Sequence, residues 1–186
     1  MESSQHQTNN RVTSSPYPSI PPLIESRDTE YSGTGITSSV AILGHPIHPV
    51  IVIFPVAFLA TVAGTDLGYW LTRGEFWAQA SLWLIGAGLL AGVAAAVVGM
   101  FDFVRIPRVR SRRAGWVHMW LNVAVLALSA VNFGLRLLGG NSTILPFGLV
   151  LSLAVATLLM ASGWYGGELT FRHKVGIVGP GETQVS

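Results

Sequence analysis

The sequence predicts an all-α integral membrane protein, a four-helix bundle with a disordered amino-terminal tail. Its 11 Lys and Arg with 9 Asp and Glu make 11% of 186 residues, against about 25% in an average soluble domain. Half of the residues are hydrophobic, and the mean hydropathy is +0.51. So few charges cannot solvate the surface of a water-soluble domain of this composition, and the balance indicates lipid.

Residues 1–40 are rich in Ser, Thr, Pro, Gln and Asn and contain only nine hydrophobic residues. No periodic apolar face runs through them, so they are expected to form a disordered tail. The basic start and apolar core of a cleavable signal peptide are missing near Met1. The membrane domain is placed at 41–178, with a flexible carboxyl terminus at 179–186.

Long uncharged intervals after residue 30 define the membrane spans. Trimmed at turn and interface signals, they give spans at about 49–71, 77–101, 116–138 and 144–165. Each reaches the roughly 20 residues with which a helix crosses a bilayer core of about 30 Å. Aromatic residues gather at the span ends, where amphipathic rings prefer the headgroup level.

Arginine placement predicts the orientation of the bundle. The connection between the second and third spans holds five arginines, whereas the other two connections hold one each. By the positive-inside rule this connection and both termini are cytoplasmic. An RNA-binding role for so short a loop is disfavoured, and no basic stripe with interleaved aromatics indicates a nucleic-acid partner.

Two spans carry distinctive faces. On the third, polar side chains follow one another at steps of three and four residues, so they share one helix face that meets protein rather than lipid. The second has small residues on one face, including the pair Gly88 and Gly92, which favours close packing within the chain over dimerisation. The members of the polar seam are His118, Asn122, Ser129, Asn132 and Arg136, with Val125 among them.

The first span holds two residues that require an explanation. Asp66 lies near its outer end, as Arg136 does in the third span, and we expect the two to form an ion pair because either charge alone would be costly near hydrocarbon. Pro55 is expected to kink the span and to leave the carbonyl near Ile51 without its helical donor.

Four of the five histidines are brought to the cytoplasmic end by the predicted topology. His45 and His48 precede the first span, His118 starts the third and His173 follows the fourth. Because His45 and His48 each precede a proline, extended geometry is expected there, and the two side chains would point the same way. Asp102 and Glu168 lie at the same depth, and Asn122 is one turn after His118.

Several interpretations of this group remain open. Imidazoles with carboxylates could hold a metal ion, with Asp102, Glu168 and Asn122 as ligands or supporting groups. Two facing histidines could instead ligate a haem b iron. In a third interpretation the histidines only cap helix ends.

Missing motifs exclude other classes. With no cysteine, the chain has no thiolate nucleophile, disulfide or cysteine-ligated cluster. Phosphate-binding glycine loops, HExxH and Gly-x-Ser-x-Gly are also missing, so catalytic residues are unknown and an enzyme is not favoured.

The motifs resemble a bacterial family of four-span membrane domains of unknown function, family 2231. They are the GHPIHP opening with Phe54-Pro55, Asp66, Gly99-Met-Phe-Asp102, His118 with Asn122, and the ending from Gly163 to His173. The resemblance covers about residues 40–178 and implies a bacterial inner-membrane protein. Some relatives resemble subunits joined to Rieske-type iron–sulfur modules, which implies redox work, although this chain has no cysteine for such a module.

Three functional hypotheses follow. The chain is a redox protein with a haem or metal at the cytoplasmic end, working with a membrane redox partner or as a homo-oligomer. Alternatively it is a cofactor-free accessory subunit of a membrane complex. A third hypothesis is a small transporter whose path follows the polar seam.

Overall fold

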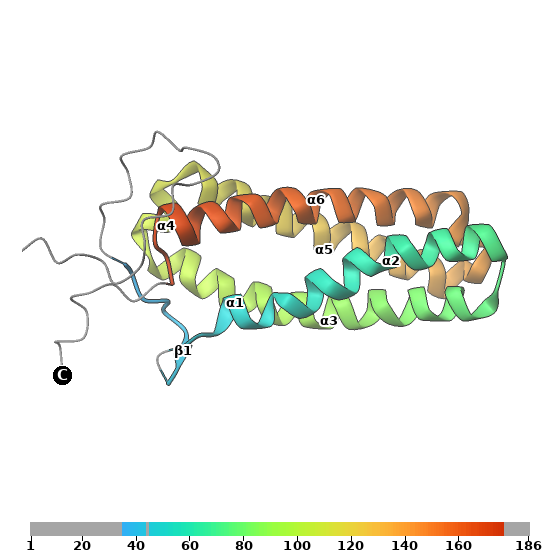
Figure 1. The fold of residues 1–186 in the computed structure, drawn as a ribbon, viewed down its shortest axis with the longest axis horizontal. Coiled ribbons are helices and arrows are strands. Elements are labelled where there is room, and N and C mark those ends of the chain that lie inside the picture. Colours follow the sequence, from blue (N-terminus) through green and yellow to red (C-terminus); the bar gives the residue numbers. More distant parts are fainter. Residues whose placement is uncertain (1–34, 44, 177–186) are drawn as a thin grey trace, which may run out of the picture.

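The computed structural model describes residues 35–43 and 45–176, which form a bundle of four long helices (Figure 1). This confirms the all-α fold class. The predicted tail up to residue 34 and the flexible end at 179–186 lie outside the described residues. In chain order the elements are β1 (Ala41–Ile42), β2 (His45–Pro46), α1 (Ile47–Ile51), α2 (Ile53–Thr72), α3 (Glu75–Arg105), α4 (Pro107–Ser111), α5 (Arg113–Gly139), the turns η2 (Gly140–Thr143) and η3 (Ile144–Gly148), α6 (Leu149–Gly167) and η4 (Glu168–Arg172).

Three stretches of the described chain are long and apolar enough to span a membrane: Ile47–Thr72, Glu75–Arg105 and the 60 residues Arg113–Arg172. As one helix the last would be about 90 Å long, three times the bilayer core. It folds back at η2 and η3, where Gly140 adopts φ 59° and ψ −149°, a conformation essentially reserved for glycine. The stretch therefore contains two helices, α5 and α6, and the bundle has four long apolar helices.

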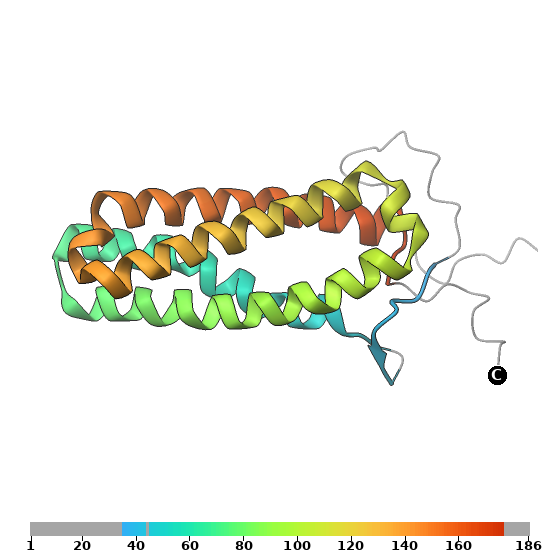
Figure 2. The ribbon, with the colours of Figure 1, turned by 180° about the vertical axis from the view of Figure 1, so that it is seen from behind.

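The helices pack as two antiparallel hairpins, α1/α2 with α3, and α5 with α6. Contacts between the hairpins run from α2 to α6 and from α3 to α5. Seen from both sides, the two hairpins lie together at the end that carries η2 and η3 and separate toward the end that carries α1 and α4 (Figures 1 and 2). This separation creates the space for the site described below.

Helix boundaries differ from the predicted spans at two prolines. The first span is divided into α1 and α2 at Val52, three residues before Pro55, because proline has no N–H to donate to the carbonyl of Ile51. Val52 itself keeps helical dihedral angles. The fourth helix becomes regular at Leu149 rather than near residue 144. Leu145 precedes Pro146 and is extended, with φ −122° and ψ 134°, outside the helical region.

The bundle core is narrow and depends on glycine. A Cβ on Gly88 would lie 2.6 Å from the side chain of Leu59, and one on Gly92 would lie 2.7 Å from Leu126. The Gly88–Gly92 pair therefore packs within the chain, as predicted from the small-residue face. Large apolar side chains such as Trp83 and Leu90 are 78% exposed on the outer surface, where lipid chains would cover them in a membrane.

Candidate functional site

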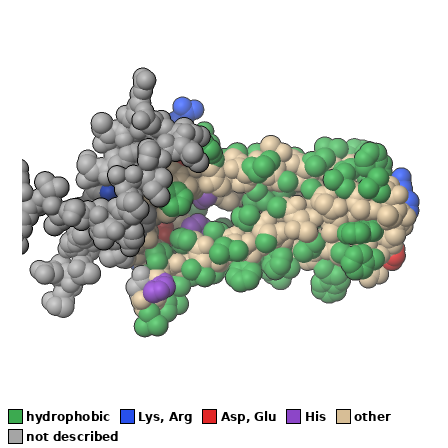
Figure 3. Space-filling model, in the orientation of Figure 1, with side chains coloured by type: hydrophobic (Ala, Val, Ile, Leu, Met, Phe, Trp, Pro, Cys, Tyr) green, Lys and Arg blue, Asp and Glu red, His purple; other side chains and the backbone are tan. Residues whose placement is uncertain are grey.

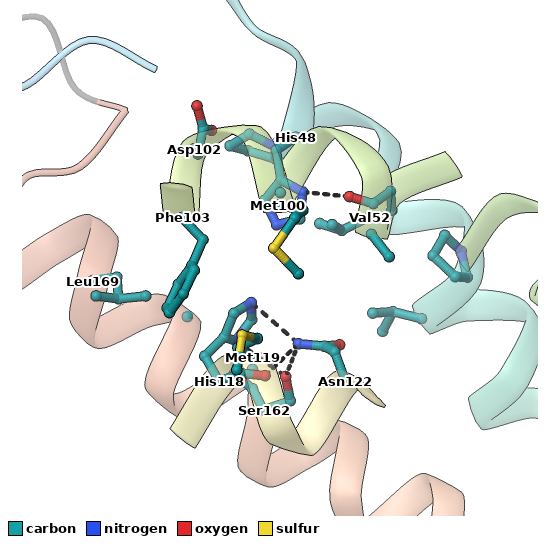
Figure 4. Close-up of a pocket in the computed structure, with 18 of the residues that line it drawn as sticks. His48, Val52, Met100, Asp102, Phe103, His118, Met119, Asn122, Ser162 and Leu169 are labelled. Atoms are coloured by element: carbon teal, nitrogen blue, oxygen red, sulfur yellow. Dashed lines mark hydrogen bonds between the residues drawn. The ribbon is translucent and has the colours of Figure 1, made fainter. Parts of the chain in front are cut away.

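Two histidines from different hairpins face each other across the open end of the bundle. His48 lies on α1 and His118 on α5, with ring centroids 6.3 Å apart and ring planes at 90°. Figure 4 shows the two rings directed toward one another, with the side chains of Met100 and Met119 beside them. These residues are 70 positions apart in the chain, so the packing of the hairpins brings them together.

Each ring is fixed by a backbone carbonyl of the other helix in its own hairpin. His48 Nδ1 lies 3.0 Å from the oxygen of Ala95 on α3, and His118 Nδ1 lies 2.9 Å from the oxygen of Ser162 on α6. Because a carbonyl only accepts, Nδ1 carries the proton in both rings. The lone pair of each neutral imidazole is then on Nε2, the atom available to a metal.

A glycine one helical turn after each carbonyl-bearing residue leaves the space that the histidine ring occupies. A Cβ on Gly99 would lie 2.6 Å from Cε1 of His48, and one on Gly166 would lie 3.0 Å from Cε1 of His118. Both glycines follow the carbonyl-bearing residue by four positions. The two hairpins thus hold their histidines by the same device, a carbonyl and a glycine on one face of the neighbouring helix.

Asn122 supports His118 from the next turn of α5. Its Nδ2 donates to the backbone oxygen of His118 and to Oγ of Ser162, both at 2.8 Å. The same nitrogen lies 3.2 Å from Nε2 of His118. The amide has two hydrogens, and the two shorter bonds use both. The longer contact to Nε2 can therefore be exchanged for a ligand without loss of the other two.

The rings border a cavity of about 380 Å³ between the hairpins, within the size range of small-molecule and cofactor sites. Its walls are mainly apolar, and the space-filling view shows a hollow between the hairpins with histidine at its edge (Figure 3). Val56, Met100 and Val123 line it and are each 45% exposed on the outer surface of the bundle. The space-filling view shows this hollow on the side of the bundle, on a surface that would face lipid in a membrane.

The other two histidines do not reach this cavity. His45 is exposed and its Nδ1 bonds to the carbonyl of Leu43, while His173 Nε2 lies 3.8 Å from Glu168 Oε1. Extended geometry holds for His45, but His48 is helical, so the expectation that they point the same way is wrong. Within the described ranges 35–43 and 45–176, no group of three or more His, Asp or Glu side chains is arranged to hold a metal ion. A single cluster of all the predicted residues is thus not formed.

A second polar group lies at the opposite end of the bundle and joins all four long helices. Arg136 Nη1 and Nη2 lie 2.9 and 2.6 Å from the two carboxylate oxygens of Asp66. Ser81 and Ser152 donate one hydrogen bond each to the same carboxylate, and Asn132 Oδ1 accepts from Arg136 Nε at 3.0 Å. We call these five residues the outer clasp.

Residues 44–179 match the family described as Predicted membrane protein (DUF2231). The chain belongs to the DUF2231 family. No curated protein and no solved structure matches it. The family assignment confirms the resemblance seen in the sequence, and it establishes a membrane protein without assigning a chemical role.

Sequence reasoning missed some of the residues that shape the site in this DUF2231 member. Ser162 was not singled out. Ala95 and Gly99 were among the small residues on one face of the second span, and Gly99 and Gly166 fell within motifs of the resemblance, but none of them was assigned to the site. The shared four-residue spacing of Ala95 to Gly99 and of Ser162 to Gly166 was an available signal. Ser81 of the outer clasp was placed on the small-residue face of the second span without a role, and Ser152 carried no signal beyond being an isolated hydroxyl in an apolar span.

The glycine beside His48 allows a direct test of the site's packing. Gly99→Ala is expected to lower the free energy of unfolding by about 1–3 kcal/mol, because the added methyl forces the ring off its carbonyl partner. Gly134→Ala is the matched control, since a Cβ there meets nothing within 4 Å and alanine favours a helix by up to about 1 kcal/mol. Denaturant titration in detergent measures both, and equal stability of the two variants would contradict the packing.

Proposed function

We propose that this protein binds one b-type haem between His48 and His118 and transfers electrons at the membrane. The observation that carries the proposal is the pair of facing imidazoles, each with Nδ1 held by a backbone carbonyl. Fixing Nδ1 in this way presents Nε2 as a ligand and orients the ring, as outer hydrogen bonds do in metal sites generally.

The spacing of the rings fits an iron atom between them. An iron–imidazole bond of about 2 Å on each side separates two axial ring centroids by about 6 Å, and the observed separation is 6.3 Å. The cavity beside the rings has a volume of about 380 Å³ and mainly apolar walls, which supports binding of an apolar cofactor between the hairpins.

The donor set favours haem over a bare metal ion. Protein-bound transition metals usually take three or four ligands from side chains, whereas only two imidazoles meet here within the described chain. A porphyrin supplies four equatorial nitrogens itself and needs only axial ligands from the protein.

The residues of the site would bind the haem, orient the two histidine rings and shield the cofactor from water. His48 and His118 would hold the iron through Nε2, the carbonyl oxygens of Ala95 and Ser162 hold the rings, and Asn122 supports His118. A bound haem would supply reversible one-electron chemistry. With both axial positions taken by imidazole, the arrangement suits electron transfer better than binding of oxygen or catalysis.

The arginine-rich segment supports an orientation for the site. Five arginines lie in or next to α4, at the end of the bundle that carries the histidine pair: Arg105, Arg108, Arg110, Arg112 and Arg113. By the positive-inside rule we infer that this end, with both termini, faces the cytoplasm of a bacterial inner membrane. Electrons would then be exchanged near the cytoplasmic surface.

The proposal is tested with detergent-purified protein. One haem per chain is expected in a pyridine haemochrome assay, with a Soret band that shifts on reduction. Protein produced without haem is expected to take up added haemin to the same stoichiometry. A folded preparation that stays colourless after haemin addition would contradict the proposal and favour the cofactor-free accessory role, in which the histidines only join helix ends. Iron or zinc without porphyrin would favour a bare metal site instead.

The transporter hypothesis receives less support. Asn132 and Arg136, at the outer end of the polar seam, are 2% and 5% exposed and are bonded within the outer clasp. A path along the seam would have to break this buried ion pair, at a cost of several kcal/mol.

A further inference from the structure

The segment 35–43, which we call the strap, lies across the end of the bundle near the histidine pair (Figure 1). Its residue Ser38 lines the cavity and is 7% exposed. Residues 35–40 belong to the stretch predicted as a disordered tail, yet the structure describes them as bonded to the bundle. Ser38 places the strap against the wall of the cavity that also contains Asp102, at the end of the bundle that carries α1 and α4.

One carboxylate holds the strap to α3. Asp102 Oδ1 accepts hydrogen bonds from the backbone N–H and the hydroxyl of Ser39, both at 2.7 Å. Ser38 Oγ lies 2.7 Å from Oδ2 and 2.9 Å from Oδ1 of the same side chain. Hydrogen bonds to a charged acceptor are about twice as strong as neutral ones, so Asp102 carries much of the attachment.

The second attachment is to the end of the chain beyond η4. Ile36 forms a parallel bridge with Val175, in which Ile36 N–H donates to Lys174 O at 2.9 Å and Gly176 N–H donates to Ile36 O at 2.7 Å. Val175 and Gly176 also line the cavity. Segments from both ends of the described chain are thus joined beside the pocket, and each contributes to its lining.

We propose that the strap is a gate that controls access from water to the cavity, with Asp102 as its latch. The strap contains no helix, and short hydrogen-bonded segments open locally at much lower free energy than a helix core. Asp102 lies three residues after Gly99, the glycine against which His48 packs, so the latch and the His48 wall belong to the same stretch of α3. The identity of the ligand rests on the proposed function, but the gate itself does not.

Chemical labelling tests the gate without any cofactor. The natural chain has no cysteine, so Met119→Cys places a single thiol in the cavity. The protein is placed in lipid nanodiscs, where lipid covers the side opening and both ends meet water. The rate of modification by a charged maleimide then reports opening of the strap.

Asp102→Asn is expected to raise this labelling rate about tenfold, because the amide has one acceptor oxygen where the carboxylate has two and its nitrogen faces other donors. Glu75→Gln is the matched control. Its exposed carboxylate accepts hydrogen bonds from Gln79 and Asn141 at the opposite end, and its rate should match that of the parent.

The double variant Ser38→Ala/Ser39→Ala removes side-chain donors from the strap and should raise the rate in the same direction. Adding Asp102→Asn to it should give less than the product of the two effects, since they remove shared bonds. Unchanged labelling in a folded Asp102→Asn protein would overturn the gate. If that variant does not fold, unchanged labelling of the serine double variant overturns it.

Haem release provides the second measurement. Transfer of haem to apomyoglobin is expected to accelerate in Asp102→Asn and not in Glu75→Gln. A protein that binds no haem but shows the labelling change would contradict the proposed function and support the gate. A haem-loaded protein with unchanged labelling and unchanged release would contradict the gate alone.

Discussion

His118→Ala protein is expected to retain less than about one tenth of the haem bound by the parent, because it loses one of two axial ligands. His48→Ala should lose haem to the same extent, since the two rings are held equivalently by Ala95 O and Ser162 O. Haem per chain, measured by the haemochrome assay on protein of verified monodispersity, gives the result directly.

Free imidazole separates ligation from a structural role. The space left by His118→Ala should admit imidazole, and millimolar imidazole should restore the Soret band of the variant. His45→Ala and His173→Ala are the matched controls and should keep the parent's haem content, because neither ring reaches the cavity. Loss of haem in His45→Ala equal to that in His118→Ala would contradict the assigned pair.

Asp66→Asn is expected to be the most destabilising single substitution in the bundle, with a loss of about 3–5 kcal/mol in unfolding free energy. The carboxylate is 0% exposed and accepts hydrogen bonds from Arg136, Ser81 and Ser152. Its neutralisation leaves the Arg136 guanidinium buried without a counter-ion. Arg136→Gln should cost a similar amount, measured by reversible unfolding in mixed detergent micelles.

The double variant Asp66→Asn/Arg136→Gln provides the control for this prediction. It should be less destabilised than the sum of the two single variants by at least about 2 kcal/mol, because no unpaired charge is left. Additive losses would show that the two residues act independently. Reversal of both charges should rescue expression only in part, since Ser81 and Ser152 are placed to donate to a carboxylate at position 66.

Periodicity predicted much of the architecture because membrane helices satisfy their own backbone and leave the side-chain pattern to report their faces. The polar seam of α5 contains His118 and Arg136, and these do lie at opposite ends of one buried face. His48 and Asp66 are separated by the same 18 residues, five helical turns. Each hairpin therefore offers one imidazole to the histidine pair and one member of the Asp66–Arg136 ion pair to the outer clasp, a relation that the spacing alone could have suggested.

The strap makes contacts that composition does not reveal. Residues 35–40 share the Ser and Thr content of the preceding stretch, and composition alone assigns them to a disordered tail. Their position depends on Asp102, a residue 63 positions away from Ser39. A contact of that sequence separation leaves no mark on local composition.

The sequence by itself determined that this is a membrane-embedded bundle, where its apolar helices lie, and that four histidines come to one end. Those properties follow from hydropathy and from the helix repeat, which are local. Only the tertiary structure decided that His48 and His118 meet while His45 and His173 do not. That choice depends on how the two hairpins separate and on the carbonyl oxygens of Ala95 and Ser162, and backbone acceptors are present at every residue, so no sequence pattern distinguishes them.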